Sequence, residues 1–163
     1  MLELSGINLI KFVVVAGLAF WSFLEGVGLI QDFTGAQKMV GKIMNMELIE
    51  TSPVVQTSLI NRRVSGSFWH KACAIILILF NFITATLLFV SLYSVAYSGW
   101  TVTGNEDFLI WANYGMALFL FMSFALSFVG LWFAYYIKQN DLMITHFVLI
   151  VFGITAATLI NLS

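Results

Sequence analysis

The sequence predicts an all-α polytopic membrane protein: an antiparallel bundle of four transmembrane helices, with an amphipathic interfacial helix in the first connection. Hydrophobic residues make up 61% of the 163 residues and charged residues only 9%, whereas soluble domains carry about 25% charged residues. Four hydrophobic runs reach the roughly 20 residues that cross a bilayer. None alternates strictly between polar and apolar positions, so helices are favoured over barrel strands.

The four runs predict spans at about residues 12–30, 72–97, 109–137 and 142–162, within one membrane domain over residues 1–163. The first run is too long for the core of a signal peptide, and no clear cleavage site follows it. We therefore expect it to be retained as a span. The single proline, Pro53, lies outside all four runs.

Residues 31–71 form the long first connection. Its segment "AQKMVGKIMNMELI" has apolar residues at helical spacing and lysines on the opposite side, which indicates an amphipathic helix in the headgroup layer. A helix that packs on a core is the alternative, but a forty-residue loop offers little core of its own. We also predict a second short helix, capped by Ser52 and begun by Pro53. The amphipathic residues are Val40, Met44 and Leu48 beside Met39, Ile43 and Met46, opposite Lys38 and Lys42.

The basic residues predict how the chain is inserted. The first connection holds five of the seven and the third turn holds Lys138, whereas the other membrane face has only Lys11. Because basic loops stay in the cytoplasm, we expect the long connection and the third turn there and both termini outside. A net charge of −1 argues against a nucleic-acid partner. The lipid bilayer is the expected surrounding.

Polar residues are few, and four antiparallel spans would bring Glu25, His70 and His146 to one membrane face. Asn81 follows His70 by eleven residues, nearly three helical turns, so the two share a helix face. These four residues form the predicted polar intramembrane cluster. Small residues at helical spacing predict three helix contact faces: Gly17, Trp21, Glu25 and Gly28; Ser123, Ser127, Gly130 and Ala134; and His146, Gly153 and Ala157.

Each polar residue has more than one interpretation. An unpaired amide in hydrocarbon costs several kcal/mol, so we expect Asn81 to face the bundle and fix helix register, or to lie on a substrate or proton path. Glu25 either pairs with Lys71 or a histidine, is hydrated near Asp32, or exchanges a proton within the membrane.

His70 and His146, the only histidines, suggest a haem held from both sides. A zinc site would need a third ligand such as Glu25. Otherwise no cofactor or metal is expected. No nucleophilic triad, phosphate-binding glycine loop or carboxylate pair is visible, so we do not expect an enzyme. Cys73 is the single cysteine, which excludes an internal disulfide and indicates a small buried thiol.

The segments "GLIQDF" (28–33), "MVGKIMNME" (39–47) and "GLWF" (130–133), with the spacing of His70 and Asn81, resemble a bacterial family of predicted small integral membrane proteins of unknown function. The resemblance covers most of the chain and implies four spans, a long first connection with a short helix, and a location in the bacterial cytoplasmic membrane. Family members typically carry an acidic residue where this chain has Asn81. The resemblance implies a fold and no activity.

Three functions remain open from the sequence. The first is a non-catalytic accessory subunit of a larger membrane complex, such as a respiratory or oxidase complex, because small-residue faces and aromatic surface abound. The second is an oligomeric transporter or channel for protons or small solutes that uses Glu25, His70 and Asn81. The third is a membrane anchor that binds haem b or a quinone through His70 and His146.

Overall fold

The computed structural model describes residues 6–102 and 104–162, and every regular element in that part of the chain is a helix. Four helices are long and apolar enough to cross a membrane, so the predicted fold class is confirmed. Thr103, in the predicted second turn, lies outside the described residues. The helices are α1 (Gly6–Gln31), α2 (Phe33–Met44), α3 (Ser67–Tyr97), α4 (Glu106–Trp132) and α5 (Asn140–Ile160), with short 3-10 helices η1 (Glu47–Ile49), η2 (Ser58–Arg62) and η3 (Tyr135–Ile137).

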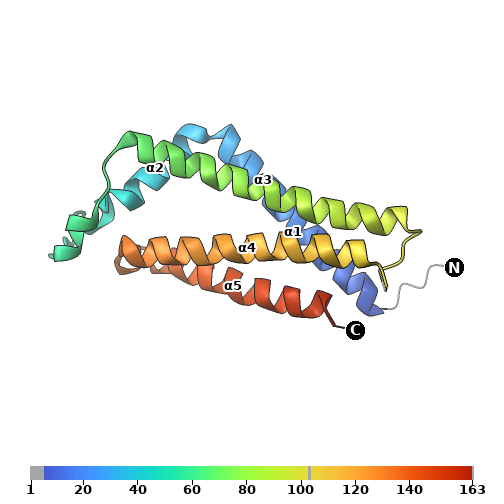
Figure 1. Ribbon diagram of the computed structural model, residues 1–163. Helices are drawn as coiled ribbons and strands as arrows, with labels where there is room; N and C mark the ends of the chain where they lie inside the picture. The colour runs from blue at the N-terminus through green and yellow to red at the C-terminus, as the bar shows by residue number, and fades with distance from the viewer. Residues whose placement is uncertain (1–5, 103, 163) are drawn as a thin grey trace.

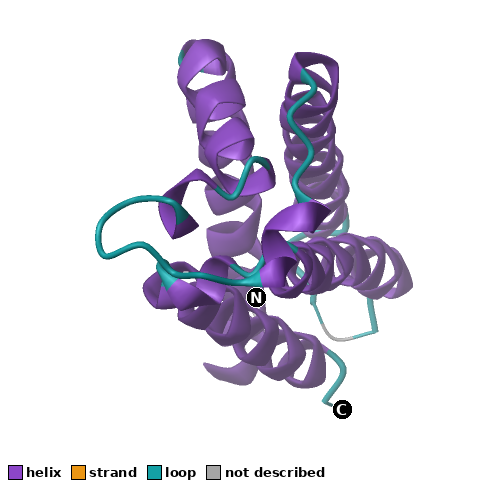
Figure 2. Cartoon of the chain, turned by 90° about the vertical axis from the view of Figure 1, so that its left-hand side faces the viewer, coloured by secondary structure: helices purple, strands orange, loops and turns teal. Residues whose placement is uncertain are grey.

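Helix α3 is central, because it packs against α1, α2 and α4, while α5 packs mainly against α4. Figure 1 shows α1 and α3 diverging from α4 and α5 toward the side where α2 lies. We call α1 and α3 one group of helices, and α4 and α5 the other. Figure 2 is seen from that side, where the two groups lie apart. We call this end, with residues 32–66 and 133–139, the connection end, and the opposite end, where α1 begins and α5 finishes, the terminus end.

Local signals explain where α4 begins and ends. The Asn105 side chain accepts a hydrogen bond from the Phe108 amide, and two acidic residues follow in the first turn, where they favour the helix dipole. Ala134 adopts a left-handed conformation with φ 50°, which ends α4 and separates η3 from it. The third span is therefore shorter than the predicted 109–137.

The terminus end is closed by a hydrophobic core with polar links between helices. Leu88, Phe108 and Met116 are almost fully buried at its centre. The Ser91 hydroxyl donates to the Phe108 carbonyl at 2.8 Å, which joins α3 to α4. Three further polar residues complete the links: Lys11 donates to the Leu162 carbonyl, and the amides of Asn113 and Asn161 bond reciprocally at 2.7 and 3.0 Å.

The first connection has a core of its own, contrary to expectation. Met44, Met46 and Ile49 are buried against Phe133 and Ala134 at the end of α4. The apolar face of α2 thus packs on the protein, while Lys38 and Lys42 are exposed on its other side. The sequence could not show this core, because two of its five buried residues, Phe133 and Ala134, lie more than eighty positions away along the chain.

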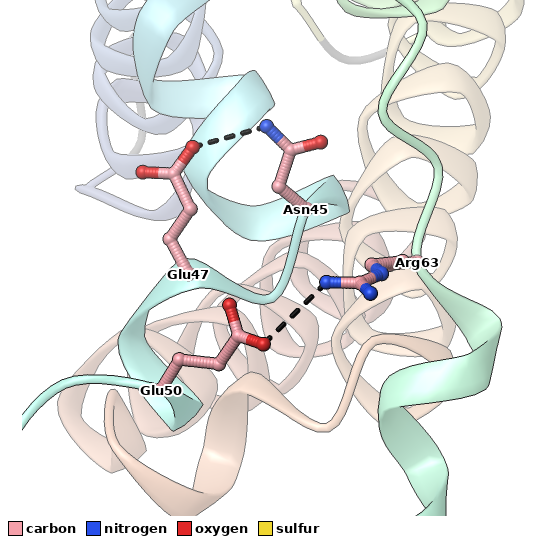
Figure 3. A network of polar contacts seen from close by, with 4 residues as sticks. All are labelled: Asn45, Glu47, Glu50 and Arg63. Atoms are coloured by element: carbon pink, nitrogen blue, oxygen red, sulfur yellow. Dashed lines mark hydrogen bonds and ion pairs between the residues drawn. The ribbon is translucent and has the colours of Figure 1, made fainter. Parts of the chain in front are cut away.

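The second short helix begins later than predicted. It is η2, and Thr57 caps it by accepting a hydrogen bond from the Leu59 amide at 3.2 Å. Ser52 and Pro53 instead lie in a bend with a cis peptide bond between them. Figure 3 shows how this region is tied together: Glu50 and Arg63 form an exposed ion pair at 3.4 Å, and Asn45 donates to Glu47 at 3.0 Å.

Candidate functional site

A cavity of about 370 Å³ lies at the connection end, between the two groups of helices. Its volume falls in the range of small-molecule sites, which are concave, mostly apolar and supplied with a few polar groups. The lining comes from α1 (Glu25, Leu29), α2 (Ala36, Met39, Val40, Ile43, Met44), α3 (Cys73, Ile76, Leu77), α4 (Met122, Ala125, Leu126, Val129), and Phe133, Tyr135, Leu142 and His146.

Three polar residues of the lining lie at a similar depth. Glu25 lies six residues before the end of α1, and Cys73 and His146 lie six residues after the starts of α3 and α5. At 1.5 Å per residue, each is about 9 Å inside its helix end. The antiparallel order of the spans therefore brings Glu25 and His146 to one cavity, together with Cys73.

Tyr135 connects the turn after α4 to α5. Its hydroxyl lies 2.5 Å from His146 Nδ1 and donates to the Leu126 carbonyl at 3.1 Å. The ring lies directly over Gly130, where any side chain would overlap it. Burial raises the pKa of the Tyr135 phenol to about 12. The phenol is therefore neutral at physiological pH and keeps its proton for hydrogen bonding.

His70 has a different environment. Its Nε2 lies 2.7 Å from the Val64 carbonyl, which can only accept, so Nε2 carries the proton. Its Nδ1 faces Gly41 of α2, where an added Cβ would lie 3.0 Å from it. The side chain is 7% exposed and borders a separate hollow beside α2. His70 thus fastens α2 and the segment before α3 to the bundle.

The four residues of the predicted polar cluster are not all brought together. Glu25 and His146 line the cavity, but His70 lies outside its lining. Asn81 is half-buried, and its amide donates to the Leu77 carbonyl of its own helix at 3.1 Å rather than across helices. Glu25 is exposed and makes no hydrogen bond or ion pair to the described residues.

The haem hypothesis uses His70 and His146, and the zinc hypothesis adds a third ligand such as Glu25. The two histidines line different hollows, and Nε2 of His70 is bound to a carbonyl. Within residues 6–102 and 104–162, no group of three or more His, Cys, Asp or Glu is placed to hold a metal ion.

Two residues of the site carry roles that the sequence did not reveal. Tyr135 looked like an aromatic residue of the membrane interface, and Gly130 like one member of a small-residue face. Their pairing depends on the left-handed Ala134, which turns the chain back on α4. A glycine five positions before a tyrosine at a helix end is the only local signal, and it is weak.

Residues 7–163 match the family described as "Predicted small integral membrane protein (DUF2165)". The chain belongs to this family. As a member, it is a small integral membrane protein whose spanning helices contact the bilayer. The family description assigns no activity. No curated protein and no solved structure matches the chain.

Proposed function

We propose that this protein is a non-catalytic subunit of a larger membrane assembly, and that one face of α1 receives a transmembrane helix of another subunit. The face consists of Gly17, Trp21, Leu24, Glu25 and Gly28, which follow one another at helical spacing and are all exposed. We call it the α1 face.

The glycines of the chain distinguish this face from the contacts inside the bundle. A Cβ added at Gly26, Gly115 or Gly153 would meet a side chain of a neighbouring helix within 3.4 Å. At Gly17 and Gly28 it would meet nothing within 4 Å. Small residues in membrane helices favour close helix approach, and no other helix among the described residues packs on these two.

Glu25 strengthens the proposal. Ionisable residues within membrane helices are rare and usually face protein or water rather than lipid. Glu25 is exposed on α1 beside Trp21 and Leu24, which are 57% and 63% exposed. A partner helix on the α1 face would contact this carboxyl at the edge of the cavity that it lines.

We further propose the bacterial cytoplasmic membrane as the location, with the connection end in the cytoplasm. The exposed basic residues Lys38, Lys42, Arg62, Arg63 and Lys71 all lie at or near that end. Short basic loops remain cytoplasmic. A cysteine introduced at Gly104 in a Cys73→Ser background should react with an impermeant maleimide in intact spheroplasts, whereas one at Lys38 should react only after lysis.

Site-specific photocrosslinking tests the subunit role. A benzoylphenylalanine at Trp21 should give one adduct of defined mass with another membrane protein in living cells. The same group at Val151 of α5, which is 65% exposed, serves as the matched control and should label only lipid. Gly17→Leu with Gly28→Leu should abolish the Trp21 adduct and co-purification in mild detergent, whereas Val151→Leu should not.

The alternatives give different results. An adduct with a second copy of this chain would replace the accessory role by a homo-oligomer. Equal labelling at Trp21 and Val151, with a chain that always purifies as a lone monomer, would contradict the proposal.

A further inference from the structure

A second hollow, of about 340 Å³, lies between α2 and the start of α3. Its volume also falls in the range of small-molecule sites, but its lining is polar, unlike that of the cavity. Most of the lining comes from one side of α2, because residues three and four positions apart share a helix face. We call it the α2 hollow, and its polar lining includes Thr34, Gln37, Lys38, Lys42, Glu47 and His70.

His70 forms the wall of the α2 hollow on the α3 side. Its side chain is 7% exposed, and its Nε2 is held by the Val64 carbonyl at 2.7 Å. Its Nδ1 lies against Gly41, another lining residue, where an added Cβ would come within 3.0 Å. The buried ring therefore fixes the spacing between α2 and α3, so the hollow has a rigid wall.

The two lysines of the α2 hollow lack partners in the protein. Lys38 and Lys42 are exposed, lie four positions apart on α2, and form no hydrogen bond or ion pair with a described residue. Lys71, just outside the hollow, has no such partner either. Like charges four positions apart on a helix repel each other, so an anion between them would be stabilising. Three other basic residues of this end do have partners: Lys138 at the Pro53 carbonyl, Arg63 at Glu50, and Arg62 over the Trp132 ring.

The charge of the lining favours an anion. Glu47 is the only acidic residue among the described residues of the lining, and one of its oxygens already accepts a hydrogen bond from the Asn45 amide at 3.0 Å. Two lysines against one glutamate leave one positive charge in excess. Lysine is a common ligand of phosphate groups, because it forms charge-assisted hydrogen bonds to their oxygens.

The α2 hollow lies at the level where two spans leave the bilayer. Helix α2 begins at Phe33, two residues after the end of α1, and His70 is the fourth residue of α3. Phe68 and Trp69, beside His70, are 72% and 56% exposed, as is typical of aromatic residues at the headgroup level. The anion that is concentrated at this level is the phosphate of a phospholipid.

We propose that the α2 hollow binds the headgroup of an anionic phospholipid, with its phosphate between the ammonium groups of Lys38 and Lys42. Thr34 lies one turn before Lys38 on the same side of α2, and its hydroxyl is a further donor to the phosphate. A zwitterionic headgroup is disfavoured, because its own ammonium group would be repelled by the two lysines. Basic pockets beside membrane spans bind anionic headgroups in this way. This role goes beyond the proposed subunit function and does not depend on it.

The test titrates the whole protein in a neutral maltoside detergent with short-chain lipids, and native mass spectrometry counts the lipids bound. One dioctanoylphosphatidylglycerol should bind about tenfold more tightly than dioctanoylphosphatidylcholine, because each lysine near a headgroup contributes several-fold to the affinity. Inorganic phosphate in large excess should leave the lipid bound, since a free anion lacks the acyl chains that hold the lipid in the micelle.

Variants separate these two lysines from the general positive charge of the connection end. Lys38→Gln with Lys42→Gln should abolish the preference for phosphatidylglycerol, whereas Lys38→Arg with Lys42→Arg should keep it. Arg62→Gln with Arg63→Gln, the matched control, removes the same charge outside the hollow and should keep the tenfold difference. Helicity and thermal unfolding confirm that each variant folds.

Several results would overturn the proposal. Equal affinity for the two lipids in the wild-type protein would show that the headgroup is not recognised. A preference that survives the loss of both lysines, or that falls equally in the arginine control, would show that the α2 hollow is not the site. Displacement by inorganic phosphate would indicate a soluble anion as the ligand instead. A failed search for a partner subunit would affect none of these results, because the α1 face is not part of the hollow.

Discussion

The two ends of the bundle are built from the same helices, but one is closely packed and the other is open. At the terminus end the helices converge on Leu88, Phe108 and Met116, and Ser91, Asn113 and Asn161 pair across helices. At the connection end they diverge around a cavity, and Nε2 of His146 has no hydrogen-bond partner among the described residues. Close packing with satisfied polar groups stabilises a fold, while space with one free polar group accommodates a ligand. Close packing is thus found at one end of the bundle and open space at the other.

The largest expected effect comes from the same substitution at the two ends. Leu88→Ala removes a fully buried side chain from the closed end and should lower the free energy of unfolding by about 2 kcal/mol, mainly through lost packing contacts. Leu77→Ala enlarges a cavity that already exists and should cost less than about 1 kcal/mol. Unfolding in mixed micelles measures both, and equal losses would contradict the comparison.

Glycine-to-alanine changes give the next largest difference. At Gly115 the new Cβ would lie 2.5 Å from Leu88 Cδ2, so overpacking between α3 and α4 should cost about 1.5 kcal/mol. At Gly17 the Cβ meets open space, and the higher helix propensity of alanine should leave stability unchanged or raised. The purified protein in the same micelles provides the measurement. A destabilised Gly17→Ala would show that α1 has a contact that the structure lacks.

Loss of the Tyr135 hydroxyl should have a moderate effect. Tyr135→Phe leaves Leu126 and His146 without their shared partner and should cost about 1 kcal/mol. Gly130→Ala, which displaces the same ring, should cost at least as much. If the two substitutions act on one contact, the double variant should lose less than the sum of the single losses.

Tyr135 also predicts a pH dependence. Its pKa is about 12 in the folded protein and about 10 in an unfolded chain. Between these values the folded protein binds the extra proton, so its stability falls as pH rises from about 10 toward 12 and is unaffected below. Unfolding curves at pH 8 and 11, with Tyr135→Phe as reference, isolate this contribution. A wild-type protein that keeps its advantage over the variant at pH 11 would contradict it.

The smallest effect is expected in the exposed loop. The Glu50–Arg63 pair is more than half exposed on both sides, and such ion pairs contribute less than about 1 kcal/mol. Arg63→Gln should therefore change the unfolding free energy by no more than about 0.5 kcal/mol, and less at high salt. A larger loss would indicate that the first connection holds the connection end together through this pair.

The sequence predicted the spans well because hydropathy and length reflect the solvent of each helix. The amphipathic pattern of α2 was also visible, since Lys38 and Lys42 oppose its apolar residues. Hydropathy carries no information on which helices touch in lipid, so neither the divergence of the two groups nor the core under α2 could be predicted. The orientation of the spans did bring Glu25 and His146 to one depth, because antiparallel order alone requires it.

The contacts of the site depend on local backbone conformation and on individual hydrogen bonds, which the hydrophobic pattern of the sequence does not predict. The bond between Tyr135 and His146 requires the left-handed turn at Ala134, a conformation that alanine rarely adopts. The side-chain amide of Asn81 donates to a carbonyl of its own helix. Any asparagine in a helix can form such a bond, so the sequence does not indicate it. His70 and His146 are the same residue type, but their neighbours give them different partners, the Val64 carbonyl and the Tyr135 hydroxyl.

Nitrogen-15 NMR of histidine-labelled protein in nanodiscs at neutral pH tests the central claim most directly. The account predicts that Nε2 of His70 carries a proton, because it donates to the Val64 carbonyl, and that Nδ1 of His146 is hydrogen-bonded to the Tyr135 hydroxyl. Variants lacking each histidine assign the signals. A His70 Nε2 without a proton, or a His146 signal that Tyr135→Phe leaves unchanged, would contradict the claim that the two histidines have different polar partners at the connection end.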